Sequence, residues 1–308
     1  MSNRPIAPRD LIAKKRKGER FAALTAYDYT SAQIVDAAGV PFILVGDTLG
    51  MVVLGHDTTL SVSLDAMIHH TAAVAKGAKQ ALVVGDLPFM TYQVNPEDAL
   101  RNAGRLMQES GCGAVKLEGG KEMAPTVQKL VNAGIPVCGH IGYCPQSTNA
   151  TGGPRVQGKS IDAAKQMIED ALALEEAGAF AIVLELVPRS LAAIITERLT
   201  IPTIGIGSGV DCDAEIQVFH DLFGLYSDFV PKHTRRYLNL AEQLQGAAAD
   251  YVKDVSERQF PGPMQSSDLK PEVERELKYT LAAEDAAQAN QERAMSPVFP
   301  KLVNGGTD

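Results

Sequence analysis

Short apolar runs alternate with longer amphipathic stretches along residues 8–257 of the chain. Runs rich in Val, Ile and Leu are typical of strands buried on both faces, and the stretches between them have the spacing of helices. Glycine ends most of these helical stretches, as expected of helix stops. We predict eight strands, near Phe21, Phe42, Ala81, Ala114, Pro136, Ala181, Pro202 and Leu225. The helices predicted between and around them cover residues 8–18, 30–38, 63–76, 96–110, 123–133, 162–177, 190–199, 213–222 and 237–257.

This alternation of strand and helix predicts an α/β fold, a parallel (β/α)8 TIM barrel. An open doubly wound sheet is the alternative, but it needs fewer strands and one main glycine-rich phosphate turn. The basic stretch 8–18 adds a short N-terminal helix. The tail is rich in Ala, Glu, Gln and Lys and predicts a helix from Pro271 to about Ala289. We therefore expect one catalytic barrel over residues 1–262 and a C-terminal extension, helical or partly disordered, over 263–308.

Charge and composition argue against nucleic acid and membrane as partners of this protein. The formal net charge of -8 argues against nucleic acid, because phosphate binding needs a basic face. No apolar stretch approaches the roughly 20 residues that span a bilayer, and the N-terminus lacks the apolar core of a secretory signal. The four cysteines show no Cys-x-x-Cys spacing and are interpreted as reduced, inert thiols. We expect a cytoplasmic protein that acts on small molecules.

Acidic side chains follow several of the predicted strands. Asp28, Asp47, Asp86, Glu118 and Glu185 each stand at the end of an apolar run, and His140 belongs to the fifth one. Barrel enzymes carry their chemistry at the carboxyl ends of the strands, so we expect these side chains to share one rim.

Several carboxylates in one small cavity repel one another unless a positive charge lies among them. A hard divalent cation such as Mg²⁺ meets that need with one or two carboxylates, water and substrate. Zinc is less favoured, because the sequence shows no Cys/His cluster of ligand spacing. Lys116 precedes Glu118 by two residues and is expected on the same face of its strand, where it would either hold an anionic substrate or neutralise the acids.

A metal beside a free carboxylate indicates enolate chemistry. The cation would chelate a 2-oxo acid and lower the pKa at the adjacent carbon, and a general base would remove the proton. The enolate would then attack an electrophile.

A series of motifs resembles the ketopantoate hydroxymethyltransferase family. These are Thr-Ala-Tyr-Asp-Tyr (25–29), Leu-Val-Gly-Asp-Thr-Leu-Gly-Met (44–51), Gly-His-Asp-Thr-Thr-Leu (55–60), Asp-Leu-Pro-Phe-Met (86–90), Val-Lys-Leu-Glu-Gly-Gly (115–120), Pro-Val-Cys-Gly-His-Ile-Gly (136–142), Pro-Gln-Ser (145–147), Val-Gln-Gly-Lys (156–159) and Ile-Gly-Ile-Gly-Ser-Gly (204–209). They occur in order between residues 8 and 262.

The resemblance implies a (β/α)8 enzyme of pantothenate biosynthesis that uses Mg²⁺ and usually forms a homodecamer. It transfers a hydroxymethyl group from 5,10-methylenetetrahydrofolate to 3-methyl-2-oxobutanoate, giving 2-dehydropantoate. By position it makes Asp47, Asp86 and Glu118 the metal ligands and Glu185 the proton acceptor. The substrate contacts that it implies are Asp47, Thr48, Asp86, Lys116 and His140, with Tyr27 close by.

The chain departs from the family pattern in two informative places. Thr48 stands where the family more often has Ser, so a hydroxyl remains but one methyl group must fit. The Glu-His-Ser-Phe that typically follows the Pro-Gly near residue 262 is absent, and the tail begins there. The alternative function is another Mg²⁺-dependent barrel enzyme acting on 2-oxo acids, of the carbon–carbon lyase or phosphonate mutase type.

Overall fold

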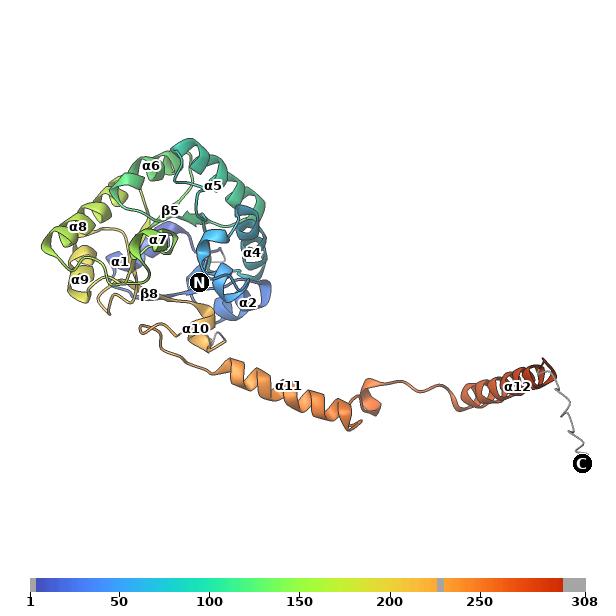
Figure 1. The fold of residues 1–308 in the computed structure, drawn as a ribbon. Coiled ribbons are helices and arrows are strands. Elements are labelled where there is room, and N and C mark those ends of the chain that lie inside the picture. The colour runs from blue at the N-terminus through green and yellow to red at the C-terminus, as the bar shows by residue number, and fades with distance from the viewer. Residues whose placement is uncertain (1–3, 226–229, 296–308) are drawn as a thin grey trace, which may run out of the picture. The chain divides into compact units, whose positions relative to one another are not determined.

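Eight parallel strands form a closed barrel in the order β1 to β8, and helices surround it (Figure 1). The computed structural model describes residues 4–225 and 230–295. The strands are β1 (Phe21–Thr25), β2 (Phe42–Val45), β3 (Leu82–Asp86), β4 (Ala114–Lys116), β5 (Val137–Gly142), β6 (Ala181–Glu185), β7 (Thr203–Ile206) and β8 (Ala214–Gln217). The prediction of a TIM barrel is confirmed.

The ring of outer helices consists of α2 (Tyr29–Ala37), α4 (Leu64–Gly77), α5 (Pro96–Ser110), α6 (Ala124–Asn132), α8 (Ile161–Glu176) and α9 (Arg189–Arg198). Side chains of Asp28, Ser63, Asn95 and Ser160 accept hydrogen bonds from backbone N–H groups in the first turns of four of them. These caps satisfy donors that have no partner inside the helix. The loops contain short helices of one turn. These are the α-helices α3 (Leu49–Val52) and α7 (Thr148–Thr151) and the 3-10 helices η1 (Thr59–Ser61), η2 (Lys121–Met123) and η3 (Pro145–Ser147).

Two apolar layers hold the barrel together. One lies between the strands and the outer helices, and the other fills the barrel interior with alternate strand residues such as Phe42, Val84 and Ile204. The N-terminal helix α1 (Pro8–Arg16) contributes Leu11 to the interior layer, where it is fully buried. The short helix predicted before the barrel therefore packs against the barrel's interior core.

The eighth strand was predicted in the wrong place. The expected helix 213–222 is in fact β8 followed by the short helix α10 (Phe219–Phe223), and four residues of the expected strand, 226–229, lie outside the described residues. Residues 207–213 connect β7 to β8 without a helix. In β8, Ala214 and Ile216 point into the barrel while Glu215 and Gln217 are half-buried, which is the alternation of a strand.

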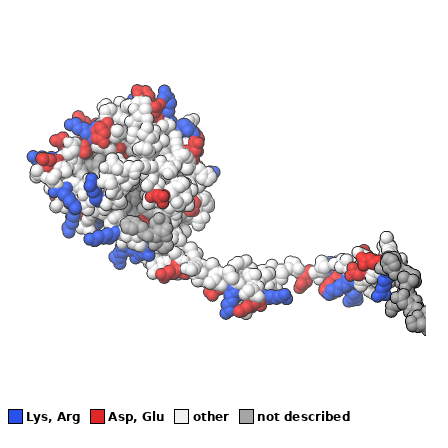
Figure 2. All heavy atoms as spheres, in the orientation of Figure 1, with Lys and Arg blue, Asp and Glu red and all other residues white. Residues whose placement is uncertain are grey.

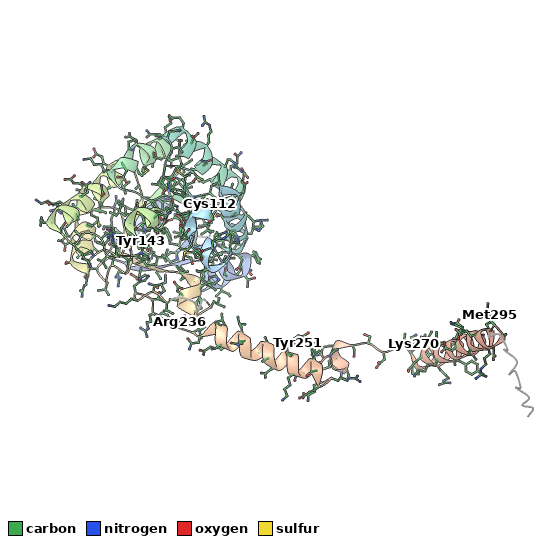
Figure 3. All side chains as sticks on the ribbon, in the orientation of Figure 1. Cys112, Tyr143, Arg236, Tyr251, Lys270 and Met295 are labelled. Carbon is green, nitrogen blue, oxygen red and sulfur yellow. The ribbon has the colours of Figure 1, made fainter. Side chains whose placement is uncertain are left out.

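The chain divides into two compact units, Met1–Gln243 and Leu244–Asp308. Helix α11 (Leu240–Ser256) continues into the second unit, which also contains η4 (Pro263–Gln265) and α12 (Pro271–Met295). Helix α12 is longer than the predicted helix. Neither α11 nor α12 has a buried residue, and Tyr251, labelled in Figure 3, is 58% exposed. The expected boundary near residue 262 stays a prediction.

Charged side chains of both signs lie mainly around the margin of the barrel unit on the face shown in Figure 2. Within the described residues, no helix is both long and apolar enough to span a bilayer.

Candidate active site

The carboxyl ends of the strands surround one cavity of about 50 Å³. Its lining includes all seven side chains to which the sequence assigned a role: Asp47, Thr48, Asp86, Lys116, Glu118, His140 and Glu185. They meet because the strands are parallel neighbours whose carboxyl ends all open on the same side of the barrel. Their chemical roles stay predictions.

Asp28 does not join this cluster, contrary to the expectation for the rim. Its side chain is exposed and accepts a hydrogen bond from Ser31 N at 2.8 Å, which caps helix α2. The neighbouring Tyr27 is buried, and its hydroxyl lies 2.8 Å from Thr48 Oγ1. Tyr27 therefore reaches the site through the Thr48 hydroxyl.

Lys116 and Asp86 form a buried ion pair at the mouth of the barrel. Lys116 Nζ contacts Asp86 Oδ1, and both side chains are at most 5% exposed. Burial alone would lower the pKa of Lys116, but Asp86, Glu118 and Asp47 outweigh it and raise that pKa above its usual value. The lysine is therefore cationic at neutral pH.

One lysine does not balance the surrounding acids. Burial raises the pKa of Asp47 well above its usual value, and the charges of Asp86 and Glu118 raise it further. Burial also raises the pKa of Asp86, with Lys116 opposing the change. Asp86 Oδ2 accepts a hydrogen bond from Asp47 N at 3.1 Å, so the ends of β2 and β3 are in direct contact. Buried, mutually repelling carboxylates are hard oxygen donors, and this donor set fits Mg²⁺.

His140 lies between two carboxylates. Its Nδ1 is 3.3 Å from Glu118 Oε1, and its Nε2 is 3.3 Å from Glu185 Oε2. Burial opposes protonation, but the two acids prevail and raise the pKa of His140 to about 9. The contacts are ion pairs, since among the described residues neither ring nitrogen has an aligned hydrogen-bond partner. The imidazolium thus connects Glu118 to Glu185.

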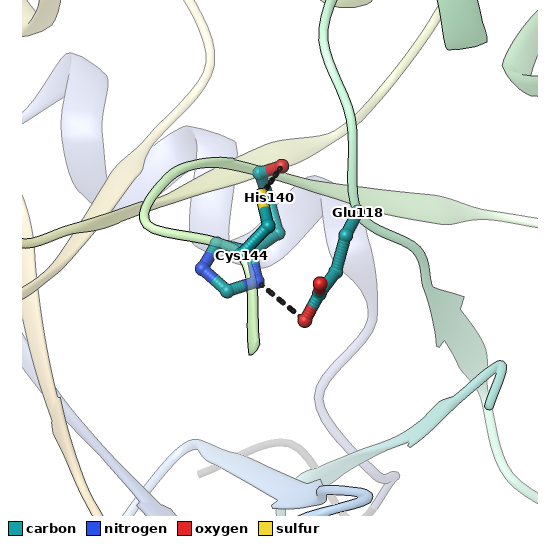
Figure 4. Close-up of side chains that lie close together, drawn as sticks. All are labelled: Glu118, His140 and Cys144. Carbon is teal, nitrogen blue, oxygen red and sulfur yellow. Dashed lines mark hydrogen bonds and ion pairs between the residues drawn. The ribbon is translucent and has the colours of Figure 1, made fainter. Parts of the chain in front are cut away.

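Cys144 completes a cluster that the sequence did not predict. The ligand atoms of Glu118, His140 and Cys144 lie within 4.8 Å of one another (Figure 4). Burial and the nearby acids raise the pKa of the Cys144 thiol well above its usual value. Zinc would require Cys144 as a thiolate and His140 as a neutral imidazole, because metal ligands must be deprotonated, whereas Mg²⁺ would use the carboxylate oxygens alone. The cluster therefore does not favour zinc over Mg²⁺.

Gln146 is a site residue whose importance sequence reasoning missed. It belongs to η3, is 4% exposed and hydrogen-bonds to both Asp47 and Glu118. The only signal was its place in the Pro-Gln-Ser motif of the family resemblance.

A larger cavity of about 420 Å³ adjoins the small one. Glu118 borders both cavities, and Cys144, Gln157 and Asp170 are among the other residues that line the larger one. Much of its wall comes from the long connection between β5 and α8, which contributes Cys144 and Gln157 among others.

Comparison with known proteins agrees with this geometry. The sequence model of a family described as ketopantoate hydroxymethyltransferase matches residues 6–263. A 3-methyl-2-oxobutanoate hydroxymethyltransferase of Chloroflexus aggregans is 60% identical over 263 residues, covering 85% of this chain and 94% of the relative. One of Dehalococcoides mccartyi is 53% identical over 270 residues, covering 88% and 96%.

Solved structures share the fold at low sequence identity. A phosphonopyruvate hydrolase superposes with a TM-score of 0.54 at 15% identity and covers 93% of this chain and 99% of its own. A 2,3-dimethylmalate lyase, described as a member of the PEP mutase/isocitrate lyase superfamily, has a TM-score of 0.51 at 14% identity, with 92% and 100% covered. At these identities the likeness supports the fold alone.

Proposed function

Because the chain belongs to the ketopantoate hydroxymethyltransferase family, we propose that it transfers a hydroxymethyl group from 5,10-methylenetetrahydrofolate to 3-methyl-2-oxobutanoate. The product is 2-dehydropantoate, a step of pantothenate biosynthesis. The observation that supports this proposal most directly is the convergence of Asp47, Asp86, Glu118 and Glu185 on one cavity at the carboxyl end of the barrel.

Asp47 and Asp86 would hold Mg²⁺, with Glu118 completing its surroundings directly or through water. The raised pKa values of Asp47 and Asp86 support this assignment, because a divalent cation would stabilise the ionised form of both. When bound, the ion would polarise the keto oxygen of the substrate and make the proton on C3 more acidic.

Lys116 and Thr48 would orient the oxo acid. The ammonium group of Lys116 suits the substrate carboxylate, and the Thr48 hydroxyl, fixed by Tyr27, suits a second oxygen. His140 would hold the remaining substrate oxygens, since it is cationic and borders the same cavity.

Glu185 would act as the general base. It is the last residue of β6, its side chain is 17% exposed, and His140 lies against one of its oxygens. It would remove the proton from C3. Water would add to the folate methylene carbon, both of that carbon's bonds to folate nitrogens would break, and the two nitrogens would take up the hydrogens of the water. C3 would then form its bond to the released one-carbon unit, which is at the oxidation level of formaldehyde, and the proton taken by Glu185 would return to the new hydroxyl oxygen.

The cosubstrate would approach through the larger cavity. The acids line the small cavity, whereas the adjoining space of about 420 Å³ has the size of a ligand pocket and room for the pterin end of the folate. We further propose a barrel domain over residues 1–262, assembly as a homo-oligomer, a decamer by family resemblance, and action in the cytoplasm.

Hydrogen exchange at C3 tests the assignment of the base. We expect Glu185→Gln to slow deuterium incorporation into 3-methyl-2-oxobutanoate at least about 100-fold, since general bases contribute about 10²–10⁴-fold. The exchange is followed by NMR with Mg²⁺ and without folate. Glu197→Gln, an exposed acid of α9, is the matched control and should exchange normally. Undiminished exchange in Glu185→Gln would rule out Glu185 as the base.

Product analysis separates this function from the lyase or phosphonate mutase alternative. The proposed reaction gives 2-dehydropantoate only when methylenetetrahydrofolate is present. Carbon–carbon cleavage or phosphoryl rearrangement of other 2-oxo acids without folate would support the alternative instead.

A further inference from the structure

Gln146 links three strand ends that the sequence places far apart. Its side chain and backbone contact residues that follow β2, β3 and β4, at sequence separations of 99, 59 and 28 residues. We propose that Gln146 is a positioning residue, which fixes the Asp47 and Glu118 carboxylates in the orientation that binds the divalent cation. This inference rests on the proposed metal-binding role of those carboxylates.

The amide of Gln146 uses its full hydrogen-bonding capacity. Nε2 donates to Asp47 Oδ2 and to the Leu87 carbonyl oxygen, both at 2.9 Å. Oε1 accepts from the Tyr92 hydroxyl at 2.7 Å and from Gln93 Nε2 at 2.9 Å. A glutamine amide has two donors and two acceptor sites, so none is left over for substrate.

These partners permit only one orientation of the amide. Asp47 Oδ2, when ionised, and the Leu87 carbonyl can only accept, whereas Gln93 Nε2 can only donate. If the Gln146 amide were rotated by half a turn, its oxygen would face the Asp47 and Leu87 oxygens and its nitrogen would face Gln93 Nε2, and these buried groups would lose their hydrogen bonds. The side chain is therefore held rigidly, and it transmits that rigidity to Asp47.

The backbone of Gln146 acts on the second carboxylate. Its N–H donates to Glu118 Oε2 at 3.0 Å, while Glu118 Oε1 lies against His140. The Tyr92 hydroxyl, which donates to the Gln146 amide, also accepts from Glu118 N at 3.0 Å. One residue thus sets the rotation of both carboxylates about their terminal bonds.

The orientation of ligand side chains affects the affinity of a protein for its metal ion. Residues that hold metal ligands through hydrogen bonds typically contribute about 10–100-fold to metal affinity. We expect Gln146→Met, which keeps the length of the side chain and removes the amide, to weaken metal binding by this factor.

Mn²⁺ binding to the full-length protein without substrates tests the inference. The dissociation constant is measured by electron paramagnetic resonance of free Mn²⁺ and by calorimetry, for the wild type, Gln146→Met and the control Gln128→Met on the exposed surface of α6. We expect about 10–100-fold weaker binding for Gln146→Met only, and recovery of its turnover at saturating metal. Wild-type affinity in a folded Gln146→Met variant would overturn the inference.

A second variant covers the case in which Gln146→Met does not fold. Tyr92→Phe leaves the ring packed and removes the hydroxyl that donates to Gln146 Oε1 and accepts from Glu118 N, so we expect several-fold weaker Mn²⁺ binding. Unchanged binding in Tyr92→Phe would then overturn the inference. A wild-type chain that binds no Mn²⁺ would refute the proposed metal site itself, which is a distinguishable result.

Discussion

Lys116 Nζ contacts Asp86 Oδ1 inside the barrel mouth, where both side chains are almost completely buried. This pair offsets one of the carboxylates that meet there and leaves Asp47 without a cationic hydrogen-bond partner among the described residues; its Oδ2 accepts instead from the neutral amide of Gln146. Burial favours the protonated form of Asp47 in the metal-free site, and a divalent cation would stabilise its ionised form instead. Lys116 stays charged, as the proposed contact with an anionic substrate requires.

Lys116→Met is expected to destabilise the fold as well as the reaction. Removing one partner of a buried ion pair leaves an uncompensated charge and costs about 3–5 kcal/mol. We expect a loss of that size in the free energy of unfolding at pH 7, measured by urea denaturation. Lys165→Met, on the exposed side of α8, is the control and should stay within about 0.5 kcal/mol of the wild type. A loss below about 1 kcal/mol in Lys116→Met would show that Asp86 is protonated or hydrated when the lysine is removed.

The Thr48 hydroxyl, held 2.8 Å from Tyr27 Oη, is expected to matter more than the Thr48 methyl group. Thr48→Val would remove the proposed hydrogen bond to the substrate, worth about 1 kcal/mol, so kcat/KM for the oxo acid should fall about 5–10-fold. Thr48→Ser keeps the hydroxyl and should stay within about 2-fold of the wild type. Steady-state kinetics with varied oxo acid distinguish the two. A loss in Thr48→Ser together with wild-type kinetics in Thr48→Val would instead mean that the methyl group, through its packing, is what the site requires.

Most strands could be located from the sequence because each is an apolar run bounded by glycine or proline. Strand β8 could not, since its outward side chains, Glu215 and Gln217, are polar. No helix lies in the connection between β7 and β8, residues 207–213, so no helix from it covers these two side chains and they can be polar. The strand is only four residues long, and such a short mixture of apolar and polar residues also fits a helix. The pairing with neighbouring strands in the barrel, which the sequence alone does not show, makes this segment a strand and not a helix.

The acids of the site were predictable for a different reason. A residue at the end of a parallel strand has its position set by the barrel, so Asp47, Asp86 and Glu185 meet without any further information. Asp28 follows the same pattern but is used as a helix cap, a choice that depends on local backbone geometry. Gln146 lies in a loop, where neither periodicity nor strand order places a side chain, and its contact with Asp47 appears only in three dimensions.

Asp10 is expected to stabilise helix α1 in a pH-dependent way. Arg4 donates two hydrogen bonds to its carboxylate and Ala7 N donates a third, which lowers the pKa of Asp10 to about 2. A lowered pKa means that the stabilisation is present above pH 4 and is lost as the pH falls toward 2. Because the pair is partly exposed, the contribution is at most about 1 kcal/mol.

Thermal unfolding of Asp10→Asn at several pH values measures this effect. The variant should unfold at a lower temperature than the wild type at pH 7, and the difference should shrink between pH 4 and pH 2. Glu19→Gln is the control for the loss of one carboxylate, because it removes the same charge from an exposed side chain whose Oε2 lies 3.5 Å from Lys14 Nζ. A difference for Asp10→Asn that is independent of pH would assign the effect to packing.

Gly142→Ala is expected to impair catalysis by moving Glu185. Gly142 ends β5 at φ +98, and an added Cβ would lie 2.2 Å from the Glu185 carbonyl oxygen, so the end of β6 must shift. A displacement of about 1 Å in a catalytic group costs about 100-fold in rate, and we expect a loss of that order in kcat. Gly134→Ala is the matched control, because Gly134 has φ +87 with no atom within 4 Å of the added Cβ. Both variants carry the left-handed strain of about 1–2 kcal/mol, but only Gly142→Ala should lose activity. Equal kcat values in the two would mean that β6 and Glu185 do not depend on the close approach of Gly142.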